Sequence, residues 1–202
     1  MEPIRVITGT AVPLDRSDVD TDQIIPAHWL KRVERTGFGA GLFSSWREAE
    51  ADFVLNREEH QGATILVAGP NFGTGSSREH AVWALTDYGF KAVISPRFGD
   101  IFRNNSTKAG LLPVVVDAEV GRSLLDAIKS DPDLEITIDV ERRRLEVPAL
   151  GIDEEFPLDD FTRYRLIEGL DDIGLTLRNE EAISAYESRR PEWMPAAPAG
   201  SG

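Results

Sequence analysis

Short apolar runs separated by polar segments of helical length dominate the middle of the chain. The runs occupy positions 64–68, 92–95 and 112–116. Each run is a candidate strand covered on both faces, because strands of buried parallel sheets are apolar without alternation. The segments 78–88 and 98–109 between them have helical length, and a glycine follows each. Strands that alternate with helices predict right-handed crossovers and an α/β fold with a parallel βαβαβ core.

The segments on either side of this core complete the predicted order of elements. On the N-terminal side we expect a strand over 4–8, an irregular loop over 11–26 and a loose helix over 45–56. On the C-terminal side we expect strands over 135–140 and 145–147 and helices over 120–129, 161–168 and 177–188. Residues 1–190 are predicted to form a single domain, because no internal repeat divides them. The segment 191–202 has the composition of a disordered tail.

Charge narrows the classes of partner. The formal net charge is −13 and the pI is about 4.7, which argues against nonspecific binding to nucleic acid or to a membrane surface. The arginine run at 142–144 is flanked by acidic residues, so we interpret it as a solvated hairpin tip rather than a binding patch. An anion site in so acidic a chain has to be built locally, from backbone dipoles and single arginines.

Residue usage narrows the chemistry. The chain contains no cysteine, which excludes disulfides and cysteine-ligated zinc or iron–sulfur sites within it. Its three histidines are scattered and lack the spacing of metal ligands. The N-terminus has no apolar leader core, and no apolar run approaches the roughly 20 residues of a membrane span. We therefore expect a cytoplasmic protein that binds no metal of its own.

The stretch 71–80, Asn-Phe-Gly-Thr-Gly-Ser-Ser-Arg-Glu-His, links the first strand of the core to its first helix. Its two glycines permit crowded or left-handed backbone conformations. Ser76 or Ser77 is placed to cap the helix, whose free N–H groups attract an anion. Arg78 adds a planar fork of donors that suits a carboxylate. The pattern predicts an anion site.

Three familiar glycine-rich or serine motifs do not match this stretch. It lacks the lysine of a P-loop, the third glycine of a dinucleotide fingerprint and the G-x-S-x-G order of a hydrolase elbow. A fourth interpretation is a serine alkoxide, stabilised by backbone N–H groups, that removes a proton beside an arginine-bound carboxylate. The competing interpretation is that Ser76 only caps the helix, and the ten residues alone leave both open.

Three separated motifs carry a family resemblance. Residues 71–80 resemble the signature of the swivelling domain of the aconitase superfamily. The stretch 20–26, Asp-Thr-Asp-Gln-Ile-Ile-Pro, resembles the N-terminal loop of the small subunits of 3-isopropylmalate dehydratase. Residues 98–110 resemble the later helix of those subunits, and 30–39 look like their bacterial form. The resemblance covers essentially residues 1–190.

The resemblance implies a fold, a partner and a reaction. The fold would be a swivelling β/β/α domain of the aconitase C-terminal type, in which strands flank the parallel core. Small subunits of this family pair with a large subunit that carries a [4Fe–4S] cluster on its own cysteines, so this chain would bind no cofactor itself. The two-subunit enzyme isomerises 2-isopropylmalate to 3-isopropylmalate by dehydration and rehydration in leucine biosynthesis.

Residue roles follow by matching the motifs. Ser76 matches the serine that takes the carbon-bound proton, and Asp22 matches the aspartate of the N-terminal motif. Ser77 and Arg78 match residues that bind the substrate carboxylate. Aconitases carry an arginine after Trp-Leu-Lys that clamps a carboxylate absent from isopropylmalate.

An ungapped alignment on Trp29-Leu30-Lys31 places Val33 at the position of that aconitase arginine. An apolar Val33 would accept an isopropyl group, whereas an unpaired buried arginine there would be costly. Arg32 is adjacent, so a shift of one residue would restore the arginine. The segment 28–34 is therefore the predicted specificity loop.

Two other functions of the chain stay open. One is a related hydro-lyase subunit, such as that of homoaconitase or of a methylmalate (citraconate) dehydratase, and the other is a noncatalytic anion-binding module.

Overall fold

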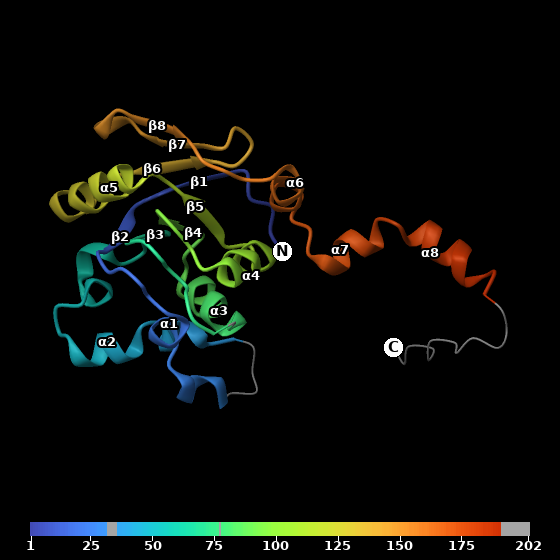
Figure 1. The fold of residues 1–202 in the computed structure, drawn as a ribbon, viewed down its shortest axis with the longest axis horizontal. Coiled ribbons are helices and arrows are strands. Elements are labelled where there is room, and N and C mark those ends of the chain that lie inside the picture. The colour runs from blue at the N-terminus through green and yellow to red at the C-terminus, as the bar shows by residue number, and fades with distance from the viewer. Residues whose placement is uncertain (32–35, 77, 191–202) are drawn as a thin grey trace.

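A computed structural model describes residues 1–31, 36–76 and 78–190 of the chain. Two four-stranded sheets and the helices around them form the body of the molecule, and two further helices extend from it (Figure 1). The described residues confirm a mixed α/β fold with a parallel sheet. The expected tail at 191–202 lies outside the described residues, as do Arg32, Val33 and Ser77.

The parallel sheet is the centre of the fold. Its strands are β2 Ala11–Leu14, β3 Ile65–Ala68, β4 Ala92–Ser95 and β5 Leu112–Val115, in that spatial order. The register pairs Ala11 with Ile65, Ile65 with Ala92 and Ala92 with Leu112. Nearly every strand residue is buried, as expected for a sheet covered on both faces. The three apolar runs of the sequence are thus confirmed as neighbouring parallel strands.

The edge strand β2 corrects one expectation, because the sequence placed an irregular loop over 11–26. Residues 11–14 are instead a fully buried strand that pairs in parallel with β3. Pro13 argued against a strand, since proline cannot donate a backbone hydrogen bond. It is tolerated here because β2 lies at the edge of the sheet, where one row of N–H groups needs no partner. The rest of the segment, after Leu14, is irregular apart from a short helix at Thr21–Ile24.

Helices cover the parallel sheet on both faces. They are α3 Glu79–Tyr88, α4 Asp100–Ala109 and α5 Ala118–Ser130. One face packs with α3, through residues such as Leu66, Val93 and Leu85. The opposite face packs with α5 and with the second sheet, through residues such as Ile65 and Leu124. Successive strand residues therefore belong to two different cores, which explains why the runs show no polar alternation.

The second sheet is antiparallel. Its strands are β1 Val6–Gly9, β6 Ile136–Asp139, β7 Arg144–Val147 and β8 Ile152–Glu155, in that order. Burial alternates along β6 and β7, because one face of the sheet packs on the core and the other meets solvent. The strand expected over 4–8 is β1, displaced toward the C-terminus. Strand β8 was not predicted, since Ile-Asp-Glu-Glu offers a single apolar residue.

The remaining elements are short. The helices are α1 Thr21–Ile24, α2 Ser44–Ala49, α6 Asp160–Glu168, α7 Asp172–Leu177 and α8 Glu180–Glu187. The 3-10 turns are Ala27–Lys31, Phe38–Gly41, Val54–Asn56, Glu58–His60 and Pro148–Leu150. The loose helix expected over 45–56 is α2 followed by a 3-10 turn, and the helix expected over 177–188 is α8, separated from α7 by Arg178 and Asn179.

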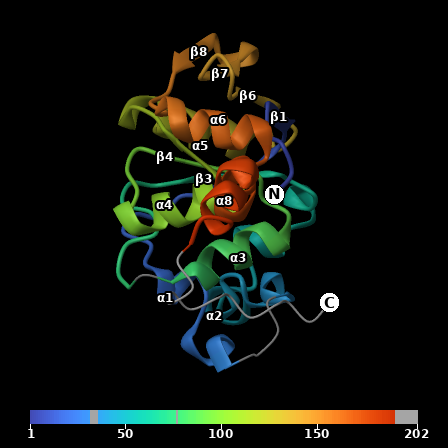
Figure 2. The ribbon, with the colours of Figure 1, turned by 90° about the vertical axis from the view of Figure 1, so that its right-hand side faces the viewer.

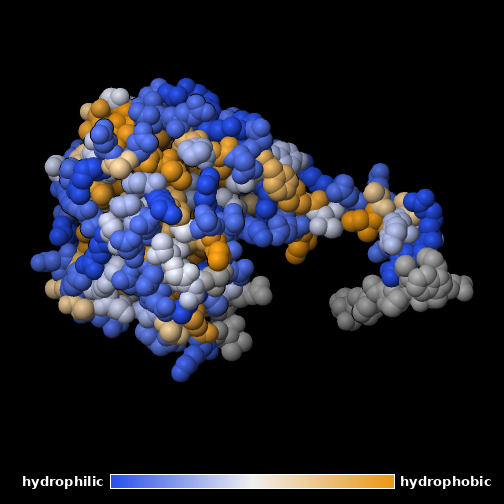
Figure 3. Space-filling model, viewed as in Figure 1, coloured by the Kyte–Doolittle hydropathy of each residue, from blue (hydrophilic) through white to orange (hydrophobic). Residues whose placement is uncertain are grey.

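Helices α7 and α8 project from the body (Figure 1), and in the view turned by 90° α8 lies in front of it (Figure 2). Ion pairs hold the base of this projection, with Arg165 Nη2 3.0 Å from Asp172 Oδ1 and Arg178 Nη2 2.8 Å from Glu168 Oε2. Apolar side chains remain exposed along it, and Figure 3 shows them as orange patches. In the part of the chain described here, no helix is long and apolar enough to cross a membrane.

Candidate active site

Three loops meet at the carboxyl edge of the parallel sheet. They follow β2, β3 and β4 and cover residues 15–25, 69–78 and 96–99. Parallel bridges join Asp20 to Thr74 and Phe72 to Phe98, so the middle loop is held from both sides. Ligands of open α/β sheets bind outside the carboxyl ends of the strands. The serine motif therefore lies where this fold places ligands.

The glycines of the middle loop are required by its backbone and by its neighbours. Gly73 and Gly75 have φ angles of +73° and +85°, which side chains rarely adopt. A Cβ added to Gly73 would lie 2.3 Å from Cγ of Phe102, on α4. The loop is also bound to its neighbour, because the Phe72 N–H donates to the Arg97 carbonyl at 3.0 Å. The turn that carries Ser76 is consequently fixed against the first turns of α4.

The start of α3 decides between two interpretations of Ser76. The residue at the N-cap of α3 is Arg78, with φ −126° and ψ 106°, so the expectation that Ser76 or Ser77 occupies the cap is wrong. Ser76 lies before the cap and is exposed, and its hydroxyl makes no hydrogen bond to another described residue. A hydroxyl that is exposed and not engaged in capping is available to a substrate. The structure thus removes the N-cap role of Ser76, and its role as a base stays a prediction.

The loop 15–25 that follows β2 contains four aspartates, and each has a different partner. Asp15 pairs with Arg122 at 2.9 Å and with Lys129, and the hydrogen bond from Arg122 is the main cause that lowers the pKa of this carboxyl. Asp18 accepts a hydrogen bond from Asn71 Nδ2 at 2.6 Å. Asp20 caps α1, where it accepts from the Gln23 N–H at 2.8 Å. Three of the four carboxylates therefore hold the loop in shape.

Asp22, the fourth aspartate, faces the serine loop. Its Oδ1 forms an ion pair with Nη1 of Arg78, and the two side chains are 54% and 19% exposed. This pair joins residues from two loops that were predicted to share a site. Nη1 of Arg78 is buried and makes no well-aligned hydrogen bond within the described residues. A mostly buried guanidinium whose Nη1 makes no well-aligned hydrogen bond, beside an exposed carboxylate, is suited to bind a second carboxylate.

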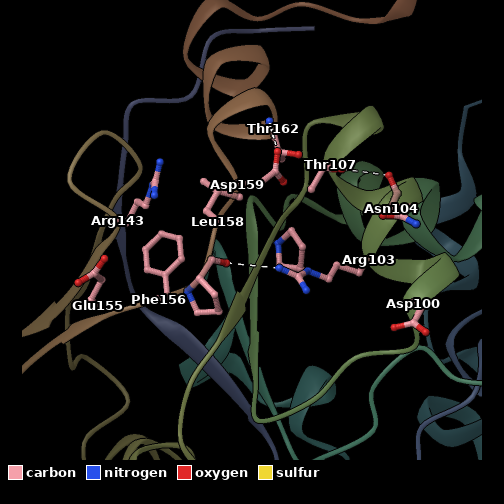
Figure 4. Close-up of a pocket in the computed structure, with 12 residues that line it drawn as sticks. Asp100, Arg103, Asn104, Thr107, Arg143, Glu155, Phe156, Leu158, Asp159 and Thr162 are labelled. Carbon is pink, nitrogen blue, oxygen red and sulfur yellow. Dashed lines mark hydrogen bonds between the residues drawn. The ribbon is translucent and has the colours of Figure 1, made fainter.

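The meeting point of Asp22 and Arg78 is distinct from the cavity that Figure 4 draws. A cavity of about 720 Å³ lies elsewhere, between α4 and the segment 156–162 (Figure 4). Arg103 on α4 and Arg143 line it, but Arg103 donates to the Pro157 carbonyl at 3.4 Å and Arg143 pairs with Asp160. Asp22, Ser76 and Arg78 are not among the lining residues.

Comparison with known proteins identifies the family. A family model described as "Aconitase C-terminal domain" matches residues 1–119, and a second, for the C-terminal domain of the 3-isopropylmalate dehydratase small subunit, matches residues 172–198. The 3-isopropylmalate dehydratase small subunit of Frankia alni is 63% identical over 197 residues, which cover 98% of this chain and 100% of the relative. The chain belongs to the 3-isopropylmalate dehydratase small-subunit family.

Further relatives agree with this assignment. The small subunit of Rubrobacter xylanophilus is 58% identical over 195 residues, which cover 96% of this chain and 98% of the relative. A crystal structure of 3-isopropylmalate dehydratase from Methanocaldococcus jannaschii matches with a TM-score of 0.66 over 90% of this chain and 99% of that chain. At 24% identity this match supports the fold alone. The expected swivelling domain of the aconitase C-terminal type is confirmed.

The structure brings some of the predicted site residues together and leaves others undescribed. Asp22, Ser76 and Arg78 meet at one edge of the sheet. Ser77, Arg32 and Val33 are outside the described residues, so their roles stay predictions. The described start of the predicted specificity loop is anchored, because Trp29 Nε1 donates to Ser44 Oγ at 3.2 Å. Thr21 was not singled out from the sequence, although its hydroxyl donates to the Ser76 carbonyl at 2.9 Å.

The described residues do not fit a metal or iron–sulfur centre. None of the groups of three or more His, Cys, Asp or Glu side chains within the described ranges could hold a metal ion. The whole sequence lacks cysteine, and cysteine thiolates are the usual ligands of iron–sulfur clusters.

Proposed function

We propose that this chain is the small subunit of 3-isopropylmalate dehydratase and that, with a large subunit, it interconverts 2-isopropylmalate and 3-isopropylmalate in leucine biosynthesis. The observation that carries the proposal is the meeting of Asp22, Ser76 and Arg78 at the carboxyl edge of the sheet, in a chain 58–63% identical to named small subunits. The enzyme class is that of the hydro-lyases, since water leaves the substrate and returns at the neighbouring carbon.

Ser76 is the proposed base. Dehydration breaks a C–H bond next to a carboxylate-bearing carbon and releases the hydroxyl from the adjacent carbon, which leaves an alkene. The Ser76 alkoxide takes that proton, and the protonated serine returns a proton when water adds in the opposite sense. An exposed hydroxyl on a turn constrained by Gly73 and Gly75 supports this role, because a general base must reach its proton in a fixed geometry.

Arg78 is the proposed carboxylate clamp, with Ser77 beside it. In the chain by itself, the guanidinium of Arg78 is paired with Asp22, and an exposed aspartate carboxylate is chemically similar to a substrate carboxylate. We infer that a substrate carboxylate joins or replaces Asp22 at the buried donor of Arg78. Asp22 then accepts a hydrogen bond or proton at the edge of the substrate, which is the catalytic part assigned to it.

The segment 28–34 is the proposed specificity loop. Val33 would contact the isopropyl group of the substrate, at the position where aconitases place an arginine. The chain leading into this loop is well supported, since the Cβ of an added side chain at Gly41 would clash with Trp29 and Ile25 at 2.5 Å.

The partner and the cofactor follow from what this chain lacks. The side chain of Asp22 and the residue Ser76 are exposed at the surface of the described chain, and the sequence has no cysteine. We propose that this surface is covered by the large subunit, which also holds the [4Fe–4S] cluster that polarises the departing hydroxyl when present. We also place the complex in the cytoplasm, where the expected small-molecule substrates occur.

The proposal is tested by mixing the purified chain with the large subunit from the same organism. The mixture should convert 2-isopropylmalate to 3-isopropylmalate, measured by chromatography, whereas each subunit alone should not. Preferred turnover of homoaconitate or of a methylmalate would assign the chain to one of the related hydro-lyases. Failure to bind any cysteine-rich, iron-containing partner would favour a noncatalytic anion-binding module instead.

The same assay tests the specificity loop. Val33→Arg should lower kcat/KM for 2-isopropylmalate by about 10–100-fold, because a charged group would replace an apolar contact of roughly 1–3 kcal/mol. The conservative variant Val33→Ile is the matched control and should stay within about threefold of the native complex. Unchanged kinetics for Val33→Arg would show that the alignment of this loop is wrong.

A further inference from the structure

We propose that Thr21 is a positioning residue, which fixes the backbone of Ser76 and couples it to the Asp22–Arg78 pair. This inference rests on the proposed function, because it concerns the placement of the proposed base. Thr21 does not touch the reacting atoms in this arrangement. It acts through Ser76 on one side and through the helix that carries Asp22 on the other.

Thr21 binds the serine loop at two points. Its backbone N–H donates to the Thr74 carbonyl at 3.0 Å, and its side-chain Oγ1 donates to the Ser76 carbonyl at 2.9 Å. Thr21 itself is only 2% exposed, so its hydroxyl is buried at the donor end of the second hydrogen bond. A Cβ placed on Gly75, between these two contacts, would lie 3.9 Å from the Thr21 hydroxyl. The hydroxyl therefore spans the turn that precedes Ser76.

Thr21 is itself held in place. It is the first residue of α1, which begins with a reciprocal capping box. Asp20 Oδ1 accepts from the Gln23 N–H at 2.8 Å, and Gln23 Oε1 accepts from the Asp20 N–H at 2.9 Å. The end of α1 is anchored by Ile24 and Ile25, which are fully buried. A threonine on so fixed a helix start has a defined side-chain direction.

One turn of helix thus faces the site in two ways. Thr21 is directed toward the backbone of Ser76, while the next residue, Asp22, pairs with Arg78. The relative position of the proposed base and the proposed clamp is set by this two-residue segment. A misplacement of about 1 Å costs roughly 100-fold in rate when a reacting group must meet its proton in a near-attack geometry.

Two substitutions of Thr21 separate the effect of its hydroxyl from the effect of its shape. Thr21→Val keeps the shape and removes the donor, which leaves the Ser76 carbonyl without this hydrogen bond. Thr21→Ser keeps the donor and removes one methyl group. If the hydroxyl positions Ser76, only the first change should disturb proton removal. Binding of the substrate carboxylate by Arg78 should survive both changes.

The test measures kcat and KM for 2-isopropylmalate in the complex reconstituted from both subunits. Thr21→Val should lower kcat by about 10–100-fold with KM within about threefold of native. Thr21→Ser should recover kcat to within about fivefold. Exchange of the substrate's carbon-bound hydrogen with solvent should slow in parallel with kcat, because it reports proton removal. A native kcat in Thr21→Val, or equal losses in both variants, would overturn the proposal.

Two controls distinguish the positioning role of Thr21 from defects in folding or assembly and from the proposed base role of Ser76. Thr21→Ala supplies a second variant without the hydroxyl, and kinetics are expressed per assembled complex isolated by gel filtration, so that losses of folding or assembly do not count. Ser76→Ala is assayed in parallel. If Ser76→Ala is inactive while Thr21→Val and Thr21→Ala are native, the positioning role fails and the base role stands. If Ser76→Ala retains native turnover, the proposed base role fails first.

Discussion

The two sheets of this molecule differ in their burial and in the charged residues that lie next to them. The parallel sheet is buried on both faces, and the loops at its carboxyl edge bring Asp22, Ser76 and Arg78 together. The antiparallel sheet alternates buried and solvent-facing residues, and its hairpin carries the densest run of arginines, at 142–144. The densest run of arginines and the predicted site residues therefore belong to different sheets of the molecule.

The arginines of the hairpin are all used within the described chain. Arg142 Nη1 lies 2.8 Å from Glu146, Arg144 Nε donates to Asp153 at 2.7 Å, and Arg143 pairs with Asp160. Exposed pairs of this kind contribute little, typically about 0–1 kcal/mol each. Arg78 differs in being mostly buried, in having a donor without a well-aligned hydrogen bond, and in pairing with an aspartate from another loop. We therefore expect Arg78 to matter more for turnover than the three arginines of the hairpin.

The largest difference between the sheets is expected in turnover. Arg78→Lys in the reconstituted complex should lower kcat/KM for 2-isopropylmalate by about 10–100-fold, mainly through KM. Lysine retains the charge but loses the planar fork, and hydrogen bonds to charged groups contribute roughly 1.5–3 kcal/mol. The matched control is Arg144→Lys on the hairpin, which should leave kcat and KM unchanged. Equal effects at the two positions would remove the distinction between the sheets.

A smaller effect, on stability alone, is expected in the antiparallel sheet. Leu145 is fully buried and pairs in register with Ile138, so Leu145→Ala should lower the free energy of unfolding by about 2–5 kcal/mol. Urea denaturation of the isolated subunit measures this change. The kcat of the assembled complex should remain native, because Leu145 lies in the core away from the carboxyl edge of the parallel sheet. A large fall in kcat per assembled complex would show that both sheets shape the active site.

Much of the fold could be predicted from local pattern. The three central strands were readable because each is a continuous apolar run between helices that end at glycines. Strand β2 was hidden by Pro13 and by the aspartates that follow it, and its pairing with β3 depends on residues more than 50 positions away. Strand β8 was hidden because its residues are mostly acidic and exposed, and only its pairing with β7 defines it.

Residues of the candidate site could be predicted when they lie in a recognisable motif. They could not be predicted when their role depends on a tertiary contact. Ser76, Arg78 and Asp22 were indicated by two stretches that resemble family motifs, and the structure places them together. The capping role considered for Ser76 was wrong, since local sequence does not fix which residue of Ser-Ser-Arg begins the helix. Thr21 gave no signal, because its role depends on a hydrogen bond to a residue 55 positions later.

The most direct test of the account is the kcat of the reconstituted complex that contains Ser76→Ala, assayed with 2-isopropylmalate. Ser123→Ala, an exposed position on α5, is the matched control and should keep native turnover. The account predicts that Ser76→Ala still assembles with the large subunit and loses about 10²–10⁴-fold in kcat, the range expected for removal of a general base. A complex that assembles and turns over at the native rate without the Ser76 hydroxyl would contradict it.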